Sequence, residues 1–324
     1  MKTANEDIKI VSAKNQLCLF GFEDYFNSFI KLYEREKLPN TILLSGPKGI
    51  GKSTFAYHII NYILSKSEER KYSVKSLVID ENNLSYKHLN ANTHPNFFLI
   101  ENNLLEKDIK IDQVRNLLKF LNKTTYSGNL KIIMIDNVEN LNLNSSNALL
   151  KAIEEPKNNT FFFIIYDSAS KILDTVKSRC AEFKFSLSLS KKKNIFANII
   201  KQYKNDFEIE AIIENYYFDT HGNLAKYFLA LEKVNINITE NTLKCILHFI
   251  EKYNNEKNPE TLSFLTLFIE KFYNELCLNN NKNLNSYFFN QSKILKQIDE
   301  MKQFNLNEKN IFIWLKNILQ NETK

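Results

Sequence analysis

Short apolar runs alternate with helix-like stretches over residues 1–184 of the chain. The runs have the pattern of buried strands, predicted at Ile42–Leu44, Asn96–Ile100, Lys131–Ile135, Thr160–Tyr166 and Ala181–Phe185. Helices are predicted between them, including Ile111–Leu121 and Ser145–Ile153. This alternation predicts an α/β fold with a parallel sheet covered by helices. A nucleotide would bind at the C-terminal edge of such a sheet.

The pattern changes after Phe185. Residues 223–324 contain no glycine and a single proline, and their apolar residues recur at helical spacing. Two such stripes are Leu262, Leu265, Phe268, Ile269, Phe272, Tyr273 and Leu276, and Ile311, Trp314, Leu315, Ile318 and Leu319. These stripes predict amphipathic helices that bury one face. A chain of 324 residues is long enough for two or three domains. We predict an α/β domain over residues 1–185, a small helical domain over 186–236 and an all-α domain over 237–324.

Three of the six glycines lie in one short window that follows the first predicted strand. The window fits the phosphate-binding pattern G-x-x-x-x-G-K-[ST], and a helix is predicted to follow it. A strand, a glycine-rich turn and a helix N-terminus together place backbone N–H groups around phosphate oxygens. Lys52 would reach the β- and γ-phosphates, and the Ser53 hydroxyl would hold Mg²⁺. The predicted nucleotide contacts here are Gly46, Pro47, Lys48, Gly49, Ile50, Gly51, Lys52, Ser53 and Thr54.

Composition narrows the class of protein. The formal net charge of +6 is compatible with a nucleic-acid partner and does not demand one. No apolar run approaches the length that spans a bilayer, and the first residues lack a signal region, so we expect a cytoplasmic protein without a membrane partner. The four cysteines are scattered without C-x-x-C spacing, which makes a zinc site or a redox motif improbable.

The strand at 131–135 ends in Asp136, as a Walker B strand does, and this carboxylate would help to hold Mg²⁺. ATPases of this kind usually place a glutamate directly after that aspartate to polarise the attacking water. Asn137 stands there instead, and an amide is a poor general base. Glu139 follows two residues later, and either points elsewhere or substitutes as the base. Binding of ATP with weak or absent hydrolysis is therefore expected.

Further motifs follow in a recognisable order. They are Leu19-Phe20-Gly21, the phosphate loop, Thr93-His94-Pro95, Ile111-Asp112-Gln113-Val114-Arg115, the Asp136 strand, Asn147–Pro156 and Ser178-Arg179-Cys180. With them the chain resembles the AAA+ subunits of bacterial sliding-clamp loaders, and especially the delta-prime subunits of the DNA polymerase III clamp loader. The last two motifs are the most specific. The resemblance covers about the first 185 residues, and beyond residue 235 the sequence offers only a compatible helical pattern.

The resemblance implies residue roles. Arg179 matches the arginine that reaches across a subunit interface to the γ-phosphate of a neighbour's ATP; without its flanking triplet it would be taken as an ordinary surface cation. Lys226 is the candidate for the basic residue of the lid that contacts nucleotide in cis, and a plain helix cation is the alternative. Lys191-Lys192-Lys193 either attracts DNA backbone or is a solvated helix start. The domains become an AAA+ P-loop domain (1–185), a helical lid (186–236) and an oligomerisation collar (237–324).

The sequence departs from the family in three places. Residues 61–92 lack the four cysteines of the usual zinc module, so zinc is predicted absent. Asn137 breaks the Walker B pair. Ile165-Tyr166-Asp167 stands where motor subunits carry a small polar sensor residue, which puts γ-phosphate sensing in doubt.

The expected function is that of a regulatory loader subunit. It would bind ATP and Mg²⁺, lend Arg179 to a neighbour, and help to place the sliding clamp on primed DNA together with gamma/tau and delta subunits. A gamma/tau-like ATPase motor is one alternative, disfavoured by Asn137, the short chain and the missing cysteines. A stand-alone P-loop NTPase or kinase is the other, and it would leave Asn147–Pro156 and Ser178–Cys180 unexplained.

Overall fold

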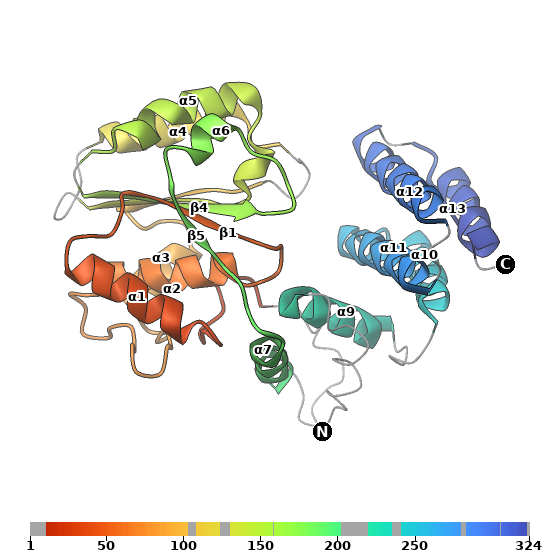
Figure 1. The fold of residues 1–324 in the computed structure, drawn as a ribbon, viewed down its shortest axis with the longest axis horizontal. Coiled ribbons are helices and arrows are strands. Elements are labelled where there is room, and N and C mark those ends of the chain that lie inside the picture. The colour runs from red at the N-terminus through yellow and green to blue at the C-terminus, as the bar shows by residue number, and fades with distance from the viewer. Residues whose placement is uncertain are drawn as a thin grey trace. The chain divides into compact units, whose positions relative to one another are not determined.

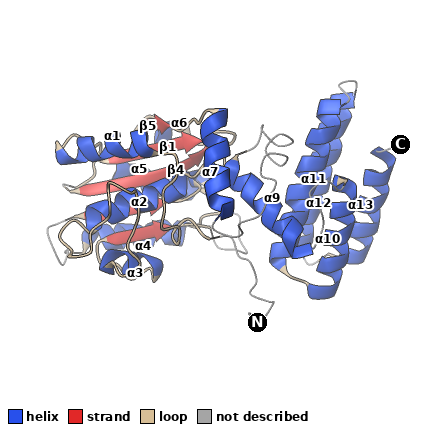
Figure 2. Cartoon of the chain, turned by 90° about the horizontal axis from the view of Figure 1, so that it is seen from below, coloured by secondary structure: helices blue, strands red, loops and turns tan. Residues whose placement is uncertain are grey.

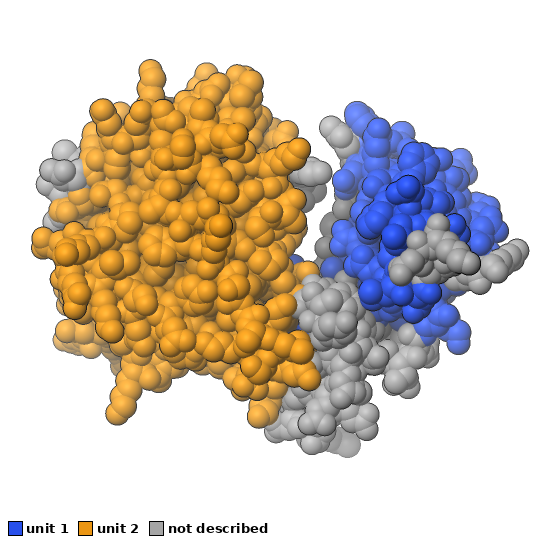
Figure 3. Space-filling view, in the orientation of Figure 1, with its two compact units in different colours: residues 1–10, 224–324 blue, residues 11–223 orange. Residues whose placement is uncertain are grey.

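The computed structural model describes residues 11–102, 108–123, 130–157, 159–201, 220–234, 241–279, 283–304 and 306–322 (Figure 1, Figure 2). The chain divides into two compact units, residues 11–223 and residues 224–324 (Figure 3). The lid predicted over 186–236 includes residues 202–219 and 235–236, which lie outside the described residues. Its boundaries therefore stay a prediction.

The first unit is built around a parallel sheet. Its elements are α1 (Glu23–Glu34), β1 (Thr41–Gly46), α2 (Lys52–Leu64), α3 (Leu84–Asn90), β2 (Phe97–Ile100), α4 (Ile111–Asn122), β3 (Lys131–Ile135), the 3-10 turn η1 (Val138–Asn140), α5 (Leu143–Glu154), β4 (Thr160–Asp167), α6 (Asp174–Lys177), β5 (Ala181–Lys184) and α7 (Leu189–Lys201). Among the described residues the five strands pair in parallel in the order β2-β3-β4-β1-β5. The predicted α/β fold is confirmed, and the predicted strand ends differ from the observed ones by at most two residues.

Helices cover both faces of this sheet, with α1, α2 and α3 on one face and α4, α5 and α6 on the other (Figure 1). Successive strand residues point to opposite faces, so Ile42 and Leu44 join one apolar cluster while Leu43 joins the other. Fully buried Phe55 of α2 and Leu149 of α5 belong to these two clusters. Burial on both faces explains why the strands read as continuous apolar runs. It also brings the carboxyl ends of the strands to one edge.

The second unit is helical. After α9 (His221–Val234), which begins in the first unit, come α10 (Thr242–Glu256), α11 (Pro259–Asn279), α12 (Leu284–Phe304) and α13 (Glu308–Glu322) (Figure 2). Consecutive helices from α10 to α13 pack against each other, and α10 also packs on α13. The predicted stripes are confirmed, since Leu265, Phe268 and Leu315 are fully buried. Among the described residues, every helix is too short or too polar to cross a bilayer.

Candidate functional site

The loop between β1 and α2 has the backbone conformation of a phosphate cradle. Gly49 and Gly51 have φ angles of +82° and +99°, a region in which any side chain would be strained. Gly51 is the N-cap residue of α2. The first N–H groups of α2 have no acceptor within the helix and carry its positive dipole end, which favours an anion at this point.

Lys52 lies inside this loop. Its side chain is only 6% exposed, and Nζ donates hydrogen bonds to the carbonyl oxygens of Gly46 at 2.7 Å and Pro47 at 2.9 Å. Burial lowers the pKa of Lys52, while the nearby carboxylates of Asp167 and Glu139 act in the opposite direction. The loop therefore already encloses the amino group that would meet a polyphosphate.

Ser53 and Asp136 meet beside Lys52. The Ser53 hydroxyl lies 3.0 Å from Oδ1 and 3.1 Å from Oδ2 of Asp136, which directly follows β3. Burial raises the pKa of Asp136, and the hydrogen bond from Ser53 opposes this rise. A hydroxyl and a carboxylate at this edge are oxygen ligands of the kind that Mg²⁺ prefers. The structure thus brings the two predicted magnesium ligands together.

Glu139 also lies at this edge of the sheet. Asn137 adopts a left-handed conformation (φ 59°) that ends β3 and starts η1. The turn directs Glu139 toward β4, where its carboxylate accepts a hydrogen bond of 3.3 Å from the backbone N–H of Asp167. Burial raises the pKa of Glu139, and Lys52 opposes this rise. The carboxylate is therefore directed to the end of β4, and whether it replaces the missing glutamate stays a prediction.

The start of α9 rests on the phosphate loop, a contact that the sequence did not reveal. The backbone N–H of Gly222 donates to the carbonyl of Gly49 at 3.1 Å, and the Thr220 hydroxyl donates to that of Lys48 at 2.9 Å. A Cβ on Gly222 would lie 2.4 Å from the Gly49 oxygen, so only glycine fits. Beside it, His221 is 4% exposed and its Nδ1 has no hydrogen-bond partner among the described residues. The one feature of the sequence that could have indicated this contact is Gly222, the last glycine of the chain.

Lys226 lies on α9 in the second unit, and it is exposed. The structure does not place it relative to the phosphate loop. Its proposed contact with nucleotide therefore stays a prediction.

Arg179 lies far along the chain from the phosphate loop, in the turn between α6 and β5. Its Nη2 lies 3.1 Å from Oε1 of Glu154, and its Nη1 donates to the carbonyl of Thr175 at 3.0 Å. The side chain is 31% exposed. A partly exposed guanidinium on the surface of the unit can reach an anion of another molecule.

The segment over residues 61–92, where the resemblance would place zinc ligands, is held by side-chain hydrogen bonds. His58 joins the Tyr72 hydroxyl at 2.8 Å, and Asn83 links α3 to this segment by accepting from Asn61 at 3.0 Å and donating to the Arg70 carbonyl at 2.6 Å. Within the described part of the chain no group of three or more His, Cys, Asp or Glu side chains is arranged to hold a metal ion. The absence of zinc remains an expectation from the sequence.

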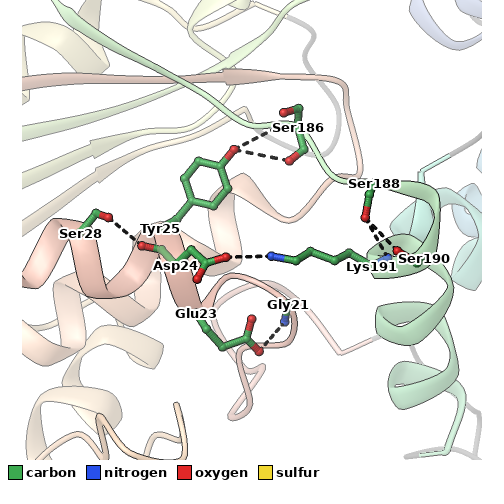
Figure 4. A network of polar contacts seen from close by, with 9 residues as sticks. All are labelled: Gly21, Glu23, Asp24, Tyr25, Ser28, Ser186, Ser188, Ser190 and Lys191. Carbon is green, nitrogen blue, oxygen red and sulfur yellow. Dashed lines mark hydrogen bonds and ion pairs between the residues drawn. The ribbon is translucent and has the colours of Figure 1, made fainter.

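A polar network ties the start of α7 to α1 (Figure 4). Lys191 lies 2.9 Å from Asp24, and the Tyr25 hydroxyl donates to the carbonyls of Lys184 at 3.2 Å and Ser186 at 3.4 Å. The Tyr25 ring also stacks on Phe185. Lys191 is thus engaged within its own chain, which favours the helix-start interpretation of the basic run at this residue.

Comparison with known proteins identifies similar chains. Residues 22–188 match the model of a family described as DNA polymerase III, delta subunit. The delta-prime subunit of DNA polymerase III from Pseudomonas aeruginosa is 34% identical over 148 residues, which cover 46% of this chain and 43% of that protein.

Two proteins of Buchnera aphidicola subsp. Schizaphis graminum are also similar. Its delta-prime subunit is 30% identical over 215 residues, covering 62% of this chain and 63% of that protein. Its DNA polymerase III gamma subunit is 30% identical over 213 residues, covering 64% and 56%. The matched regions thus span between 43% and 63% of these relatives.

Proposed function

Because this chain belongs to the DNA polymerase III delta-subunit family, we propose that it is a delta-prime-like subunit of a clamp loader. In this role it binds ATP with Mg²⁺, supplies Arg179 to the ATP site of a neighbouring subunit, and helps to load a sliding clamp onto primed DNA. Its partners are gamma/tau and delta subunits in a cytoplasmic hetero-oligomeric ring, with residues 237–324 making most of the subunit contact. The assembly contacts DNA through its backbone, without sequence preference.

The residues of the loop fit a nucleotide. The backbone N–H groups over residues 46–54 would hold the phosphates, Lys52 would neutralise them, and Ser53 with Asp136 would hold the metal ion. The hydrogen bonds between Ser53 and Asp136 support this assignment, because they join two residues 83 positions apart at the mouth of the loop. A bound nucleotide supplies a polyphosphate that neighbouring subunits can sense.

The observation that carries the regulatory role is Asn137, which follows Asp136 at the position of the usual glutamate. A site with metal ligands and no adjacent base favours binding over turnover. One alternative function is also supported, that of a gamma/tau-like ATPase motor. It is favoured by the gamma relative and by Glu139, which lies at the end of β4 and within the electrostatic reach of Lys52.

Nucleotide binding is tested on the full chain by thermal unfolding with Mg²⁺ and increasing ATP. Binding to the folded state alone stabilises it by about 2.7 kcal/mol at 100 times the dissociation constant. We expect this protection with negligible turnover. No protection at saturating ATP contradicts the proposal, and rapid turnover by the chain alone supports the motor instead.

The role of Arg179 is tested in a loader reconstituted from all subunits. Arg179→Ala should leave ATP binding by this chain unchanged and slow the ATPase of the loader, since an arginine finger can contribute about 10³- to 10⁵-fold in rate. An unchanged loader rate would remove this assignment.

A further inference from the structure

The two most specific sequence motifs meet at one ion pair in the folded chain. Glu154, from the motif at 147–156, is the last residue of α5, and Arg179 is the central residue of the triplet at 178–180. The carboxylate oxygen Oε1 and Nη2 lie 3.1 Å apart across 25 residues of sequence. A direct contact therefore joins the two motifs in this chain.

The Arg179 guanidinium is held at two points. Nη2 is bound by Glu154 and Nη1 by the carbonyl of Thr175, while Nε is enclosed and has no acceptor among the described residues. A guanidinium carries five N–H bonds. Two are used and one is enclosed, so one N–H on each terminal nitrogen remains for an incoming anion. The side chain is thus held at two points and keeps one N–H on each terminal nitrogen, donors of the kind that suit a phosphate.

We propose that Glu154 is the positioning residue of Arg179, and this inference rests on the proposed role of Arg179. By binding one terminal nitrogen, the carboxylate fixes the arginine in the conformation that meets a phosphate of the neighbour's nucleotide. An unrestrained arginine would lose its rotamer freedom on binding, whereas a side chain fixed beforehand loses less. The side chain of Glu154 is 54% exposed, and such ion pairs are weak, so we expect an effect of about two- to fivefold.

The first test uses the reconstituted loader with Glu154→Gln, which keeps the shape and removes the charge. We expect kcat for ATP to fall about two- to fivefold, with KM unchanged and with the thermal midpoint of the chain unchanged. Glu154→Asp, which retains a carboxylate, should recover part of the rate. Glu155→Gln is the matched control, because Glu155 is the adjacent exposed glutamate of the same motif, and it should behave as wild type.

The second test asks whether Glu154 acts through Arg179. In an Arg179→Ala background, Glu154→Gln should cause no further loss of rate, since a pair that acts as one unit is non-additive. A readout independent of activity is the side-chain Nε–H NMR spectrum of the chain alone. The sequence contains four arginines, so the Arg179 signal can be assigned from its absence in Arg179→Ala. We expect this signal to report a rigid side chain in wild type and a mobile one in Glu154→Gln.

The outcomes separate the two claims. If Arg179→Ala leaves the loader rate unchanged, the proposed finger is wrong and this inference falls with it. If Arg179→Ala is slow but Glu154→Gln matches wild type in rate and in the NMR signal, only the positioning role is wrong. A faster Glu154→Gln loader, or an additive double variant, also overturns it, because the carboxylate would then compete with the phosphate or act on the fold alone.

Discussion

Burial sets the charge of individual histidine side chains in the first unit. His58 and His221 are buried and His94 is half-buried, and because burial disfavours the imidazolium, the pKa of each is lowered to about 4. These histidines are neutral at physiological pH. Burial lowers the pKa of Lys52, and the carboxylates of Asp167, Glu139 and Asp136 oppose this shift. Lys52, and none of these histidines, is therefore the candidate for the positive group that meets a phosphate.

Lys52→Ala should weaken ATP binding by the full chain. A hydrogen bond to a charged group contributes about 1.5–3 kcal/mol, so the dissociation constant should rise by roughly 10- to 150-fold. The measurement is the ATP-dependent shift in thermal midpoint. Lys48→Ala, which removes an exposed cation of the same loop, is the control and should retain most of the shift. An ATP shift in Lys52→Ala equal to wild type would contradict the phosphate-loop assignment.

The lowered pKa of His58 predicts that the folded protein loses stability in acid. Its Nε2 faces the Gln16 carbonyl at 3.0 Å, so this nitrogen carries the proton and Nδ1 accepts from Tyr72. Since the folded pKa is about 4 and the unfolded pKa about 6.5, the unfolded state takes up the proton first as pH falls. The contribution of His58 to stability is therefore complete above pH 6.5, declines toward pH 4, and is about 2 kcal/mol lower at pH 5.

Urea unfolding of wild type and His58→Gln at pH 7.5 and pH 5 measures this term. Glutamine offers a donor and an acceptor and does not titrate. We expect His58→Gln to be less stable at pH 7.5 and to lose about 2 kcal/mol less than wild type on acidification. An identical loss in both proteins would show that His58 does not carry the dependence.

At the scale of secondary structure, the local sequence pattern was sufficient to predict an element whose buried residues follow its own periodicity. The strands of the sheet are apolar throughout because both faces are covered, and the helices of the second unit show a buried stripe, so both were predictable. The contact of α9 with the phosphate loop was not, because it joins residues 172 positions apart and depends on the absence of a side chain at Gly222. The pairing of Glu154 with Arg179 could not be predicted either, because the two residues lie 25 positions apart. The sequence identified both motifs but not their contact.

Gly222→Ala tests the contact between the start of α9 and the phosphate loop. Alanine is favoured over glycine in a helix by about 1 kcal/mol. Its Cβ would lie 2.4 Å from the backbone oxygen of Gly49, which cannot move without distorting the loop. Overpacking typically costs about 1–3 kcal/mol, so we expect a net loss of stability and a smaller ATP-dependent thermal shift.

Urea unfolding with and without ATP measures both effects of Gly222→Ala. Thr220→Ser is the matched control, because it retains the hydroxyl that donates to the Lys48 carbonyl. A Gly222→Ala protein as stable as wild type would mean that helix propensity outweighs the contact.

At the scale of the whole molecule, the chain combines an α/β unit that carries the phosphate loop and Arg179 with a helical unit that carries large exposed apolar side chains. Phe288 and Phe289 on α12 are 55% and 67% exposed. Single exposed apolar residues are common, but two adjacent phenylalanines are a suitable point to test the proposed subunit contact.

Phe288→Ser combined with Phe289→Ser should reduce co-purification with tagged gamma/tau and delta subunits. The helical content and the unfolding midpoint should change little, because surface substitutions usually alter stability by no more than about 0.5 kcal/mol each. Leu84→Ser, which removes a comparably exposed apolar side chain from α3, is the control and should assemble normally. Normal assembly of the double variant would place the subunit contact elsewhere.

The hydrogen bonds of His58, Asn61 and Asn83 have a practical consequence for handling the protein. The segment in which zinc is predicted to be absent is tied by neutral groups that a chelator does not touch. EDTA should therefore strip Mg²⁺ from a nucleotide complex while amide exchange over residues 65–96 stays as slow as before. We therefore expect chelation to remove the metal ion of the proposed nucleotide complex without loosening this segment.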